Sequence, residues 1–177
     1  MRITVLLALV FMTIGGSGIQ AEDKQPLQTV ASVDLERYLG KWYEIASYPA
    51  WFQRGCTGST AEYSQLPNGR IQVVNRCFKK SLDGPLKESK GKAEVVDTQT
   101  NAKLKVWFFW PFKGDYWIID LARDYTWAVV GTPSRKYLWV LSRTPTLDPH
   151  VYNDILSRLP VKGYDPDRLQ LTVQPSP

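Results

Sequence analysis

The sequence contains little of the chemistry on which most enzymes depend. There is one histidine, His150, and there are two cysteines among 177 residues. No Gly-x-Ser-x-Gly motif occurs, and no cluster of His and Cys has the spacing of a metal site. A lone histidine at the exposed start of a helix also argues against haem ligation. We therefore expect no metal and no cofactor. A catalytic alternative would need a pair of carboxylates inside the fold, with Glu44 or Asp120 pointing inward.

Long runs of one charge are absent as well. The formal net charge is +5, and no basic run is longer than two residues, as at Lys79-Lys80. No nucleic-acid-binding motif accompanies these scattered charges. We expect a solvated, mildly basic surface with weak attraction to anionic membrane surfaces, and no nucleic-acid partner.

Only one long apolar run occurs, at residues 3–14, between Arg2 and a small, polar stretch that ends at Ala21. A run of about 12 apolar residues is too short to span a bilayer, which needs about 20. The pattern is that of a secretory signal peptide, so residues 1–21 are expected to be removed on export. The first cysteine is Cys56, so the sequence predicts no lipid anchor at the cleavage site and a soluble mature protein.

The two cysteines of an exported chain favour one disulfide. Cys56 and Cys77 lie on either side of a hairpin that turns at Asn68-Gly69. In a simple register Cys77 would face Thr60, so Cys56 is expected to fold back over the start of its strand. Such a bridge would contribute roughly 3 kcal/mol to stability. Two reduced, buried thiols are the alternative.

After the leader, the chain consists mainly of short segments with the pattern of strands, separated by turn residues. Eight are predicted: residues 41–48, 57–66, 70–78, 87–97, 102–110, 115–122, 126–132 and 136–143. Nearly every connection is short enough for a hairpin, and an open sheet of this size would leave exposed edges. We therefore predict an all-β protein, an eight-stranded antiparallel up-and-down barrel.

One amphipathic helix follows the strands. Asp148 and Pro149 form a start signal, apolar residues recur on one face as far as Leu159, and Pro160 stops the helix. This helix is expected to pack outside the barrel, before a short last strand at residues 169–173. The predicted plan has a signal peptide, a loose N-terminal segment, one barrel domain and a tail, at residues 1–21, 22–32, 33–174 and 175–177.

Aromatic residues are unusually dense between residues 103 and 116. Those present are Trp107, Phe108, Phe109, Trp110, Phe112 and Tyr116. The interior of an eight-stranded barrel can be filled by side chains or can hold one small ligand, and aromatic walls favour an apolar ligand. The loop at residues 49–55 carries Trp51 and Phe52 and suits a lid. Each aromatic residue taken alone would also fit a packed core, but together they predict a cavity.

Three motifs occur in a characteristic order: Gly40-x-Trp42, Arg123-Asp124-Tyr125, and Leu-Ser-Arg-Thr-Pro at residues 141–145. In this order and spacing they resemble the lipocalin family, over residues 33–173. The stretches at residues 38–46 and 137–145 resemble the bacterial lipocalins, which are relatives of apolipoprotein D. The resemblance implies a barrel that binds a ligand rather than one that catalyses a reaction.

The resemblance also assigns structural roles at one barrel end. Trp42, after Gly40, would plug the closed end, and Arg143 would pack across it in a cation–π contact worth about 1–2 kcal/mol. Asp124 and Tyr125 would lie in the neighbouring hairpin. The chain departs from apolipoprotein D in its cysteines. Cys56 matches one there, but the last predicted strand has no partner, which leaves Cys77.

The pocket is predicted from the resemblance together with strand alternation. Trp139, Tyr63 and Asn75 resemble pocket positions of this subfamily, and period two adds their neighbours. The predicted ligand contacts are Tyr63, Val73, Asn75, Leu104, Val106, Phe108, Tyr116, Ile118, Tyr137, Trp139 and Leu141. Tyr116 is expected near the open rim, where it would hold a polar head group with Tyr63 and Asn75, and Lys113 would attract an anionic one.

The predicted function is that of an exported protein that carries an amphipathic lipid, such as a fatty acid or a lysophospholipid. The alternatives are a carrier of another small hydrophobic ligand, such as a retinoid-like molecule, a pigment or a drug, and an enzyme that acts on a lipid-like substrate. The expected location is the periplasm or the outside of the cell, with association with the outer membrane as a further option. The chain would be a monomer or a dimer.

Overall fold

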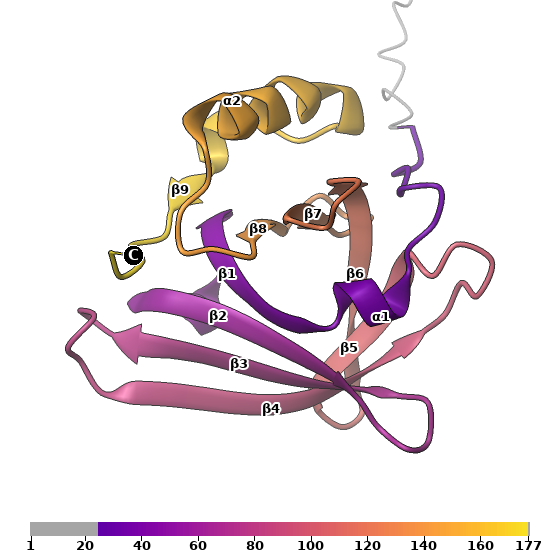
Figure 1. Ribbon diagram of the computed structural model, residues 1–177, viewed down its shortest axis with the longest axis horizontal. Coiled ribbons are helices and arrows are strands. Elements are labelled where there is room, and N and C mark those ends of the chain that lie inside the picture. Colours follow the sequence, from indigo (N-terminus) through magenta and orange to yellow (C-terminus); the bar gives the residue numbers. More distant parts are fainter. Residues whose placement is uncertain (1–24, 177) are drawn as a thin grey trace, which may run out of the picture.

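The computed structural model describes residues 25–176 (Figure 1). The predicted signal peptide, residues 1–21, lies outside the described residues, as do residues 22–24 and 177. The barrel strands are β1 (Gly40–Ser47), β2 (Cys56–Gln65), β3 (Ile71–Lys79), β4 (Leu86–Val95), β5 (Lys103–Phe109), β6 (Phe112–Leu121), β7 (Trp127–Gly131) and β8 (Leu138–Ser142). The other elements are α1 (Leu35–Tyr38), α2 (Pro149–Arg158), the 3-10 helices η1 (Trp51–Gln53), η2 (Pro160–Lys162) and η3 (Pro166–Arg168), and a two-residue strand, β9 (Gln170–Leu171).

Each barrel strand pairs antiparallel with the next one in the chain, and a further antiparallel pairing joins β8 to β1. The β1–β2 register runs from Gly40 opposite Tyr63 to Tyr43 opposite Thr60, and in the β8–β1 pairing Ser142 lies opposite Tyr43. Together these pairings close the sheet into a ring in which each of β1 to β8 has a neighbour on both sides. The predicted fold, an eight-stranded antiparallel up-and-down barrel, is confirmed. The short β9 pairs with the second half of β1, beyond the part that contacts β2.

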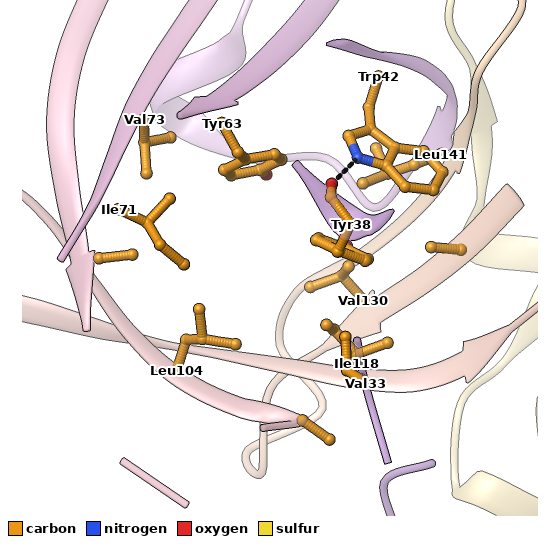
Figure 2. Close-up of a cluster of buried hydrophobic side chains, with 13 residues drawn as sticks. Val33, Tyr38, Trp42, Tyr63, Ile71, Val73, Leu104, Ile118, Val130 and Leu141 are labelled. Atoms are coloured by element: carbon orange, nitrogen blue, oxygen red, sulfur yellow. Dashed lines mark hydrogen bonds between the residues drawn. The ribbon is translucent and has the colours of Figure 1, made fainter. Parts of the chain in front are cut away.

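Strand alternation divides the apolar side chains into an inner and an outer cluster. The inner cluster includes Trp42, Val73 and Ile118, which point toward one another from different walls of the ring (Figure 2). The outer cluster contains Val140 of β8 and receives Ile155 from α2. Helix α2 accordingly lies outside the ring of strands (Figure 1), so its predicted position is confirmed.

The N-terminal segment is packed, although the sequence predicts a loose one. Leu27 is buried in the outer cluster, and the backbone N–H of Val30 donates to the carbonyl oxygen of Ile118 at 3.0 Å. Arg135 in the β7–β8 connection donates to the carbonyl oxygen of Gln25. Apolar contact and backbone hydrogen bonds to the barrel therefore hold residues 25–32. Nothing in the polar local sequence indicates these long-range partners.

The β5–β6 hairpin is tighter than the sequence predicts. The predicted strands at residues 102–110 and 115–122 leave residues 111–114 for a loop, but β6 begins at Phe112, which pairs with Phe109. The two aromatic side chains favour an extended backbone more strongly than the nearby glycine disfavours it. Only Trp110 and Pro111 remain to make the turn, so the aromatic residues of this hairpin lie at its tip.

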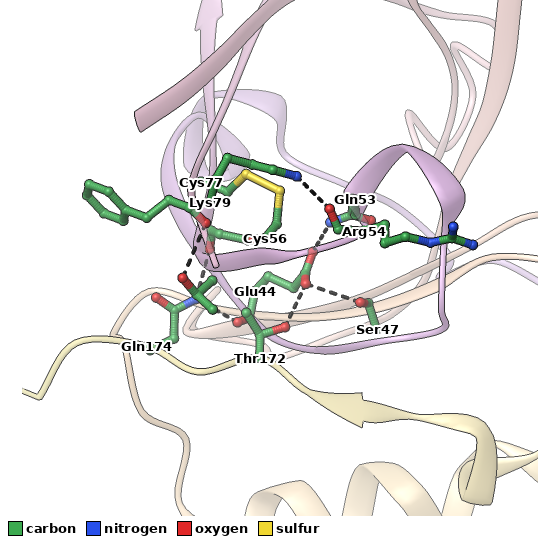
Figure 3. The surroundings of a disulfide bond; sticks show 12 residues. Glu44, Ser47, Gln53, Arg54, Cys56, Cys77, Lys79, Thr172 and Gln174 are labelled. Carbon is green, nitrogen blue, oxygen red and sulfur yellow. Dashed lines mark hydrogen bonds between the residues drawn. A yellow bond between two sulfur atoms is a disulfide. The ribbon is translucent and has the colours of Figure 1, made fainter. Parts of the chain in front are cut away.

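Cys56 and Cys77 form the predicted disulfide, with their Cα atoms 5.4 Å apart (Figure 3). The expectation that Cys56 folds back over its strand is wrong, because Cys56 lies within β2, opposite Lys79. The pairing register of β2 and β3 shifts at Gly58, where one extra residue bulges from β2. Gly58 has a φ of +57°, a left-handed conformation that glycine adopts without strain. The bulge brings the two cysteines into diagonal contact.

Trp42 and Arg143 lie together at one end of the barrel. Trp42 is fully buried, and its indole N–H donates to the carbonyl oxygen of Tyr38 at 2.9 Å. The guanidinium carbon of Arg143 lies 3.7 Å from the centre of the indole ring, which is a cation–π contact. The Arg143 nitrogens also donate to the carbonyl oxygens of Arg37, Leu39, Lys41 and Tyr125. One side chain thus ties α1, the start of β1 and the β6–β7 hairpin to the end of β8.

The β6–β7 hairpin borders this closed end. Tyr125 has a positive φ of 65°, which turns its carbonyl oxygen toward Arg143 Nε at 3.2 Å. Asp124 accepts hydrogen bonds from the backbone N–H and the hydroxyl of Thr126, so it stabilises the turn itself. Gly40 has a φ of +91°, and a Cβ atom there would lie 3.4 Å from Arg143 Nη1. Glycine therefore provides both the conformation and the space that the guanidinium needs.

Replacing Arg143 by alanine should lower the free energy of unfolding by about 3 kcal/mol. The change removes the cation–π contact and leaves several carbonyl oxygens without their donor. Arg143→Lys keeps the charge but loses the planar fork, so we expect an intermediate loss. Urea unfolding followed by circular dichroism measures both. Arg123→Ala, at an exposed arginine of the neighbouring hairpin, is the control and should change stability by no more than about 0.5 kcal/mol. An unchanged unfolding midpoint in Arg143→Ala would contradict the assigned role.

Candidate functional site

The inward-facing side chains of the barrel form the candidate site, and three tyrosines meet at its floor. Tyr38 comes from α1, Tyr63 from β2 and Tyr116 from β6. The Tyr63 hydroxyl donates to the Tyr116 hydroxyl at 2.9 Å, and the Tyr38 hydroxyl lies 2.8 Å from the same oxygen. The Tyr38 ring packs against Trp42 with 5.0 Å between ring centroids (Figure 2). The hydroxyls therefore form a small polar cluster directly above the closed end.

Burial controls the ionisation of this cluster. It raises the pKa of Tyr63 to about 12. Burial also raises the pKa of Tyr38 and that of Tyr116 well above the usual range. Tyr63 adds to the rise in pKa at Tyr38, whereas Tyr38 and Tyr63 both add to the rise at Tyr116. Phenol groups lose solvation when they ionise in an apolar interior, so all three stay neutral at ordinary pH. The floor can therefore offer hydrogen bonds but no charge.

The walls above the tyrosines are apolar and become less buried toward the opposite end. Along β5, Leu104 is buried, whereas Val106 and Phe108, which are farther from the closed end, are half-buried. Along β8, Leu141 is buried and Trp139 is half-buried. We call this opposite end the mouth; there lie the connections β1–β2, β3–β4, β5–β6 and β7–β8. The gradient in burial indicates that the interior opens at the mouth.

Aromatic residues of the β1–β2 connection lie against one side of the mouth. The ring centroids of Tyr137 and Trp139 are 5.8 Å apart in a stacked arrangement, and Phe52 lies 5.5 Å from Tyr137. The indole N–H of Trp139 donates to Gln53 Oε1 at 2.9 Å. The segment that the sequence suggests as a lid, residues 49–55, is thus fixed to Trp139 by a hydrogen bond and by ring contacts.

Glu44 anchors the same segment from below. Its carboxylate accepts hydrogen bonds from Gln53 Nε2 at 2.6 Å, from the Ser47 hydroxyl at 3.1 Å and from the Thr172 hydroxyl at 2.6 Å (Figure 3). The Glu44 side chain is buried, and these three donors compensate for its loss of hydration. Gln53 therefore links Glu44 to Trp139.

The arrangement of Glu44 and Asp120 does not favour the catalytic alternative. Asp120 accepts a hydrogen bond from Arg158 of the outer helix α2 at 2.9 Å, so it points away from the interior. Glu44 uses its oxygens to position the mouth segment. His150 lies at the exposed start of α2. These carboxylates do not face each other across the barrel as a pair of acid and base groups would.

The predicted position of the polar head-group contacts needs correction. Tyr116 was expected at the rim, but its hydroxyl and that of Tyr63 are hydrogen-bonded to each other at the floor. Lys113 forms an ion pair with Glu94 and lies 4.8 Å from the ring centre of Trp107, on the outer surface of the barrel. Strand alternation gives the face of each residue but not its depth, which explains the first error. The long-range pairing with Glu94 explains the second.

The chain also resembles known proteins in sequence. A family profile described as a lipocalin-like domain matches residues 33–174. Over 146 residues the chain is 40% identical to the outer membrane lipoprotein Blc of Vibrio cholerae, an overlap that covers 82% of this chain and 85% of that protein. The Blc of Escherichia coli strain K12 is 41% identical over 146 residues, with 82% of both chains covered. Apolipoprotein D of Mus musculus is 33% identical over 179 residues, with 95% of this chain and 91% of that one covered.

The chain belongs to the lipocalin family. Solved structures show the same fold at lower identity. Insecticyanin from the tobacco hornworm Manduca sexta superposes with a TM-score of 0.67 at 20% identity, covering 85% of each chain. Apocrustacyanin C2 gives a TM-score of 0.66 at 18% identity and covers 81% of each chain. At these identities the likeness concerns the barrel architecture alone.

Most residues predicted to contact a ligand in this lipocalin lie together on the inner face. The inner cluster and its half-buried neighbours contain Tyr63, Val73, Leu104, Val106, Phe108, Tyr116, Ile118, Trp139 and Leu141. Tyr137 lies beside them at the mouth, stacked on Trp139. Asn75 is exposed, opposite Ala61 on β2, at a position that alternation turns inward. Contact with a ligand stays a prediction for all eleven.

Sequence reasoning missed several residues of the site. Ile71 belongs to the inner cluster and follows from Val73 by the same alternation, so the signal was present. Tyr38 enters the floor from α1, outside the strand pattern. Gln53 and Glu44 act through hydrogen bonds across the mouth, and no local pattern indicates such partners.

No helix within residues 25–176 has both the length and the apolar character needed to cross a membrane. Nor does that part contain three or more His, Cys, Asp or Glu residues grouped to hold a metal ion.

Tyr63→Phe should make the stability of this lipocalin less sensitive to alkaline pH. Tyrosines of the unfolded chain ionise near pH 10, whereas folded Tyr63 stays protonated to about pH 12. The stabilising contribution of the neutral Tyr63 is therefore complete below about pH 10 and is lost as pH rises toward 12. Between about pH 10 and 12, the unfolding free energy of Tyr63→Phe should therefore fall less steeply than that of wild type, by about 1.4 kcal/mol per pH unit.

Urea unfolding between about pH 9 and 11 measures this slope. Val73→Ala, a nearby change in the inner cluster without an ionisable group, serves as the control. It should lower stability at every pH and leave the slope unchanged. Equal slopes for wild type and Tyr63→Phe would mean that Tyr63 ionises in the folded protein as readily as in the unfolded chain.

Proposed function

We propose that this lipocalin is an exported carrier that holds one amphipathic lipid, such as a fatty acid or a lysophospholipid, in its barrel. The observation that carries the proposal is the incomplete burial of the apolar inner face. Val106, Phe108 and Trp139 point inward but are only half-buried. A barrel filled by its own side chains would bury them, so the upper interior has apolar surface available for a ligand.

An acyl chain would run along these half-buried residues toward the tyrosine floor. Each methylene group removed from water contributes about 0.8 kcal/mol. Part of this gain is offset by the entropy lost on binding, which favours dissociation constants in the low-micromolar range. The floor has no charge to hold a charged head group, and its three hydroxyls are hydrogen-bonded to one another, so it can face the end of a hydrocarbon chain.

The polar head group would therefore lie at the mouth. Asn75 of β3 is exposed there and pairs with Ser89 of β4, and Lys87 pairs with Cys77 on the same inward face. An amide, a hydroxyl and an ammonium group could bind a carboxylate or a phosphate. Asn75 is thus kept from the sequence-based prediction, and Ser89 and Lys87 replace Tyr63, Tyr116 and Lys113 as the proposed head-group contacts.

The proposed location follows the predicted signal peptide and the relatives. Outer membrane lipoprotein Blc and apolipoprotein D match most of the chain. Their names support a place outside the cytoplasm and a lipid-related role for this lipocalin. We propose the periplasm or the extracellular space, where Cys56 and Cys77 can remain oxidised.

Trp139→Ala should weaken binding of a fluorescent fatty acid at least about tenfold, because it removes the largest half-buried aromatic surface of the inner face. Titration of the purified protein with the labelled acid measures the dissociation constant. Trp107→Ala is the matched control, since Trp107 lies on the outer surface beside Lys113, and its affinity should stay within about twofold of wild type.

The outcomes separate the proposal from its competitors. If wild type does not bind the fatty acid or a lysophospholipid, the proposed ligand class is wrong. If Trp139→Ala binds as well as wild type while Trp107→Ala does not, the ligand occupies the outer surface. Native mass spectrometry of the purified protein then shows whether another apolar molecule, such as a pigment, occupies the barrel.

A further inference from the structure

The tip of the β5–β6 hairpin presents three large aromatic side chains to solvent. Phe109 is 80% exposed, Trp110 75% and Phe112 78%. Phe109 and Phe112 are paired across the hairpin, so the backbone holds them in place at the end of two strands. An apolar group this concentrated on a protein surface is unfavourable in water and marks a contact with a partner.

A second exposed aromatic group lies at the same end of the barrel. Trp51 is 78% exposed and Phe52 40%, both in η1 of the β1–β2 connection. Alternate connections of an up-and-down barrel lie at the same end, so η1 and the β5–β6 tip both border the mouth. In the order of the ring they occupy opposite sides of it. Every large aromatic residue that is exposed within residues 25–176 lies in these two segments.

Charge is distributed unequally between the two ends. The mouth connections, residues 48–55, 80–85, 110–111 and 132–137, carry the basic residues Arg54, Lys80, Arg135 and Lys136 against one acid, Asp83. The connections at the closed end, residues 66–70, 96–102 and 122–126, carry Arg70 and Arg123 against Asp97 and Asp124. The excess of basic residues therefore lies at the mouth, beside the exposed aromatic residues.

We propose that the mouth docks onto a lipid bilayer that contains anionic lipid. The β5–β6 tip and Trp51 insert among the head groups, and the basic connections contact the lipid phosphates. Tryptophan and phenylalanine partition into the interfacial region of a membrane, where the ring is removed from water. Lysine and arginine near an anionic surface add electrostatic attraction that salt weakens. Two aromatic groups on opposite sides of the mouth would hold it against the membrane.

This docking goes beyond ligand carriage, since it does not depend on which molecule the barrel holds. It also assigns to the mouth the weak attraction to anionic membranes that the sequence predicts. An oriented mouth would let an apolar ligand pass between the bilayer and the barrel with little exposure to water. A protein partner with an apolar surface is the competing occupant, and vesicles without protein distinguish the two.

Co-sedimentation with large vesicles tests the proposal. The wild-type chain should bind vesicles of phosphatidylcholine with phosphatidylglycerol more tightly than vesicles of phosphatidylcholine alone. The triple variant Phe109→Ser, Trp110→Ser, Phe112→Ser should lose at least about tenfold in partition coefficient. Val161→Ser, at a residue that is 92% exposed and lies beside α2, is the matched control and should bind as wild type does.

A second variant locates the contact without changing its apolar character. Trp110→Phe should still bind vesicles, but part of the tryptophan quenching by brominated lipids should disappear, because Trp110 no longer reports from the interface. The other tryptophans stay in place and provide the reference emission. Unchanged quenching in Trp110→Phe would mean that this tip does not enter the membrane.

Wild type that binds neither vesicle type, or a triple variant that binds as tightly as wild type, would overturn the proposal. Fatty-acid titration of the triple variant in solution keeps this result separate from the proposed function. Ligand binding should persist there at wild-type affinity, because the changed side chains are exposed at the hairpin tip and are not among the proposed ligand contacts. Loss of ligand binding in wild type with retained vesicle binding would reject the carrier function and leave the docking in place.

Discussion

A charged guanidinium placed over a buried indole is the contact on which the closed end of this barrel depends. Arg143 lies 3.7 Å from the Trp42 ring centre and donates to backbone carbonyl oxygens from three separate segments. Without it, only apolar contact and the hydrogen bond from the Trp42 indole N–H to the carbonyl oxygen of Tyr38 would hold Trp42 against the covering helix α1. This end is sealed, and the tyrosine floor lies directly above it. The inner face of the barrel therefore becomes less buried only toward the opposite end. The position of the candidate site thus follows from a structural contact that does not touch the ligand.

The fold could be predicted from sequence because its signals are local and repeated. Strand alternation, short turns and one amphipathic helix each restrict the topology, and a ring is the arrangement that leaves no long edge exposed. Errors arose where a distant partner overrides the local pattern. Residues 25–32 look loose until Leu27 meets the outer cluster, and the bulge at Gly58 follows from the pairing of two strands rather than from residues nearby.

The sequence predicted which side chains of the candidate site face inward, but not how deep each one lies along the barrel. Alternation identified the inward face correctly for residues such as Val73 and Leu104. Depth along the barrel depends on tilt and on cross-strand register, so Tyr116 was placed at the rim although its hydroxyl lies at the floor. The positions of polar side chains at the mouth were the hardest to predict. The hydrogen bond from Gln53 to Glu44 joins a loop residue to a strand residue, and neither periodicity nor composition indicates that pairing.

The pairing of β9 with β1 has a consequence for the order of folding. Thr172 donates its backbone N–H to Ile45, and Gln174 bridges the carbonyl oxygens of Glu44 and Ser59, where β1 and β2 separate. These partners are more than a hundred residues apart in the chain, and contacts of such high sequence separation cost the most loop entropy. We expect these contacts of Thr172 and Gln174 with β1 and β2 to form after the hairpins. Until then the second half of β1 has unpaired backbone groups along one edge, so a partly folded chain is most open to wrong pairing at the edge that β9 covers in the finished barrel.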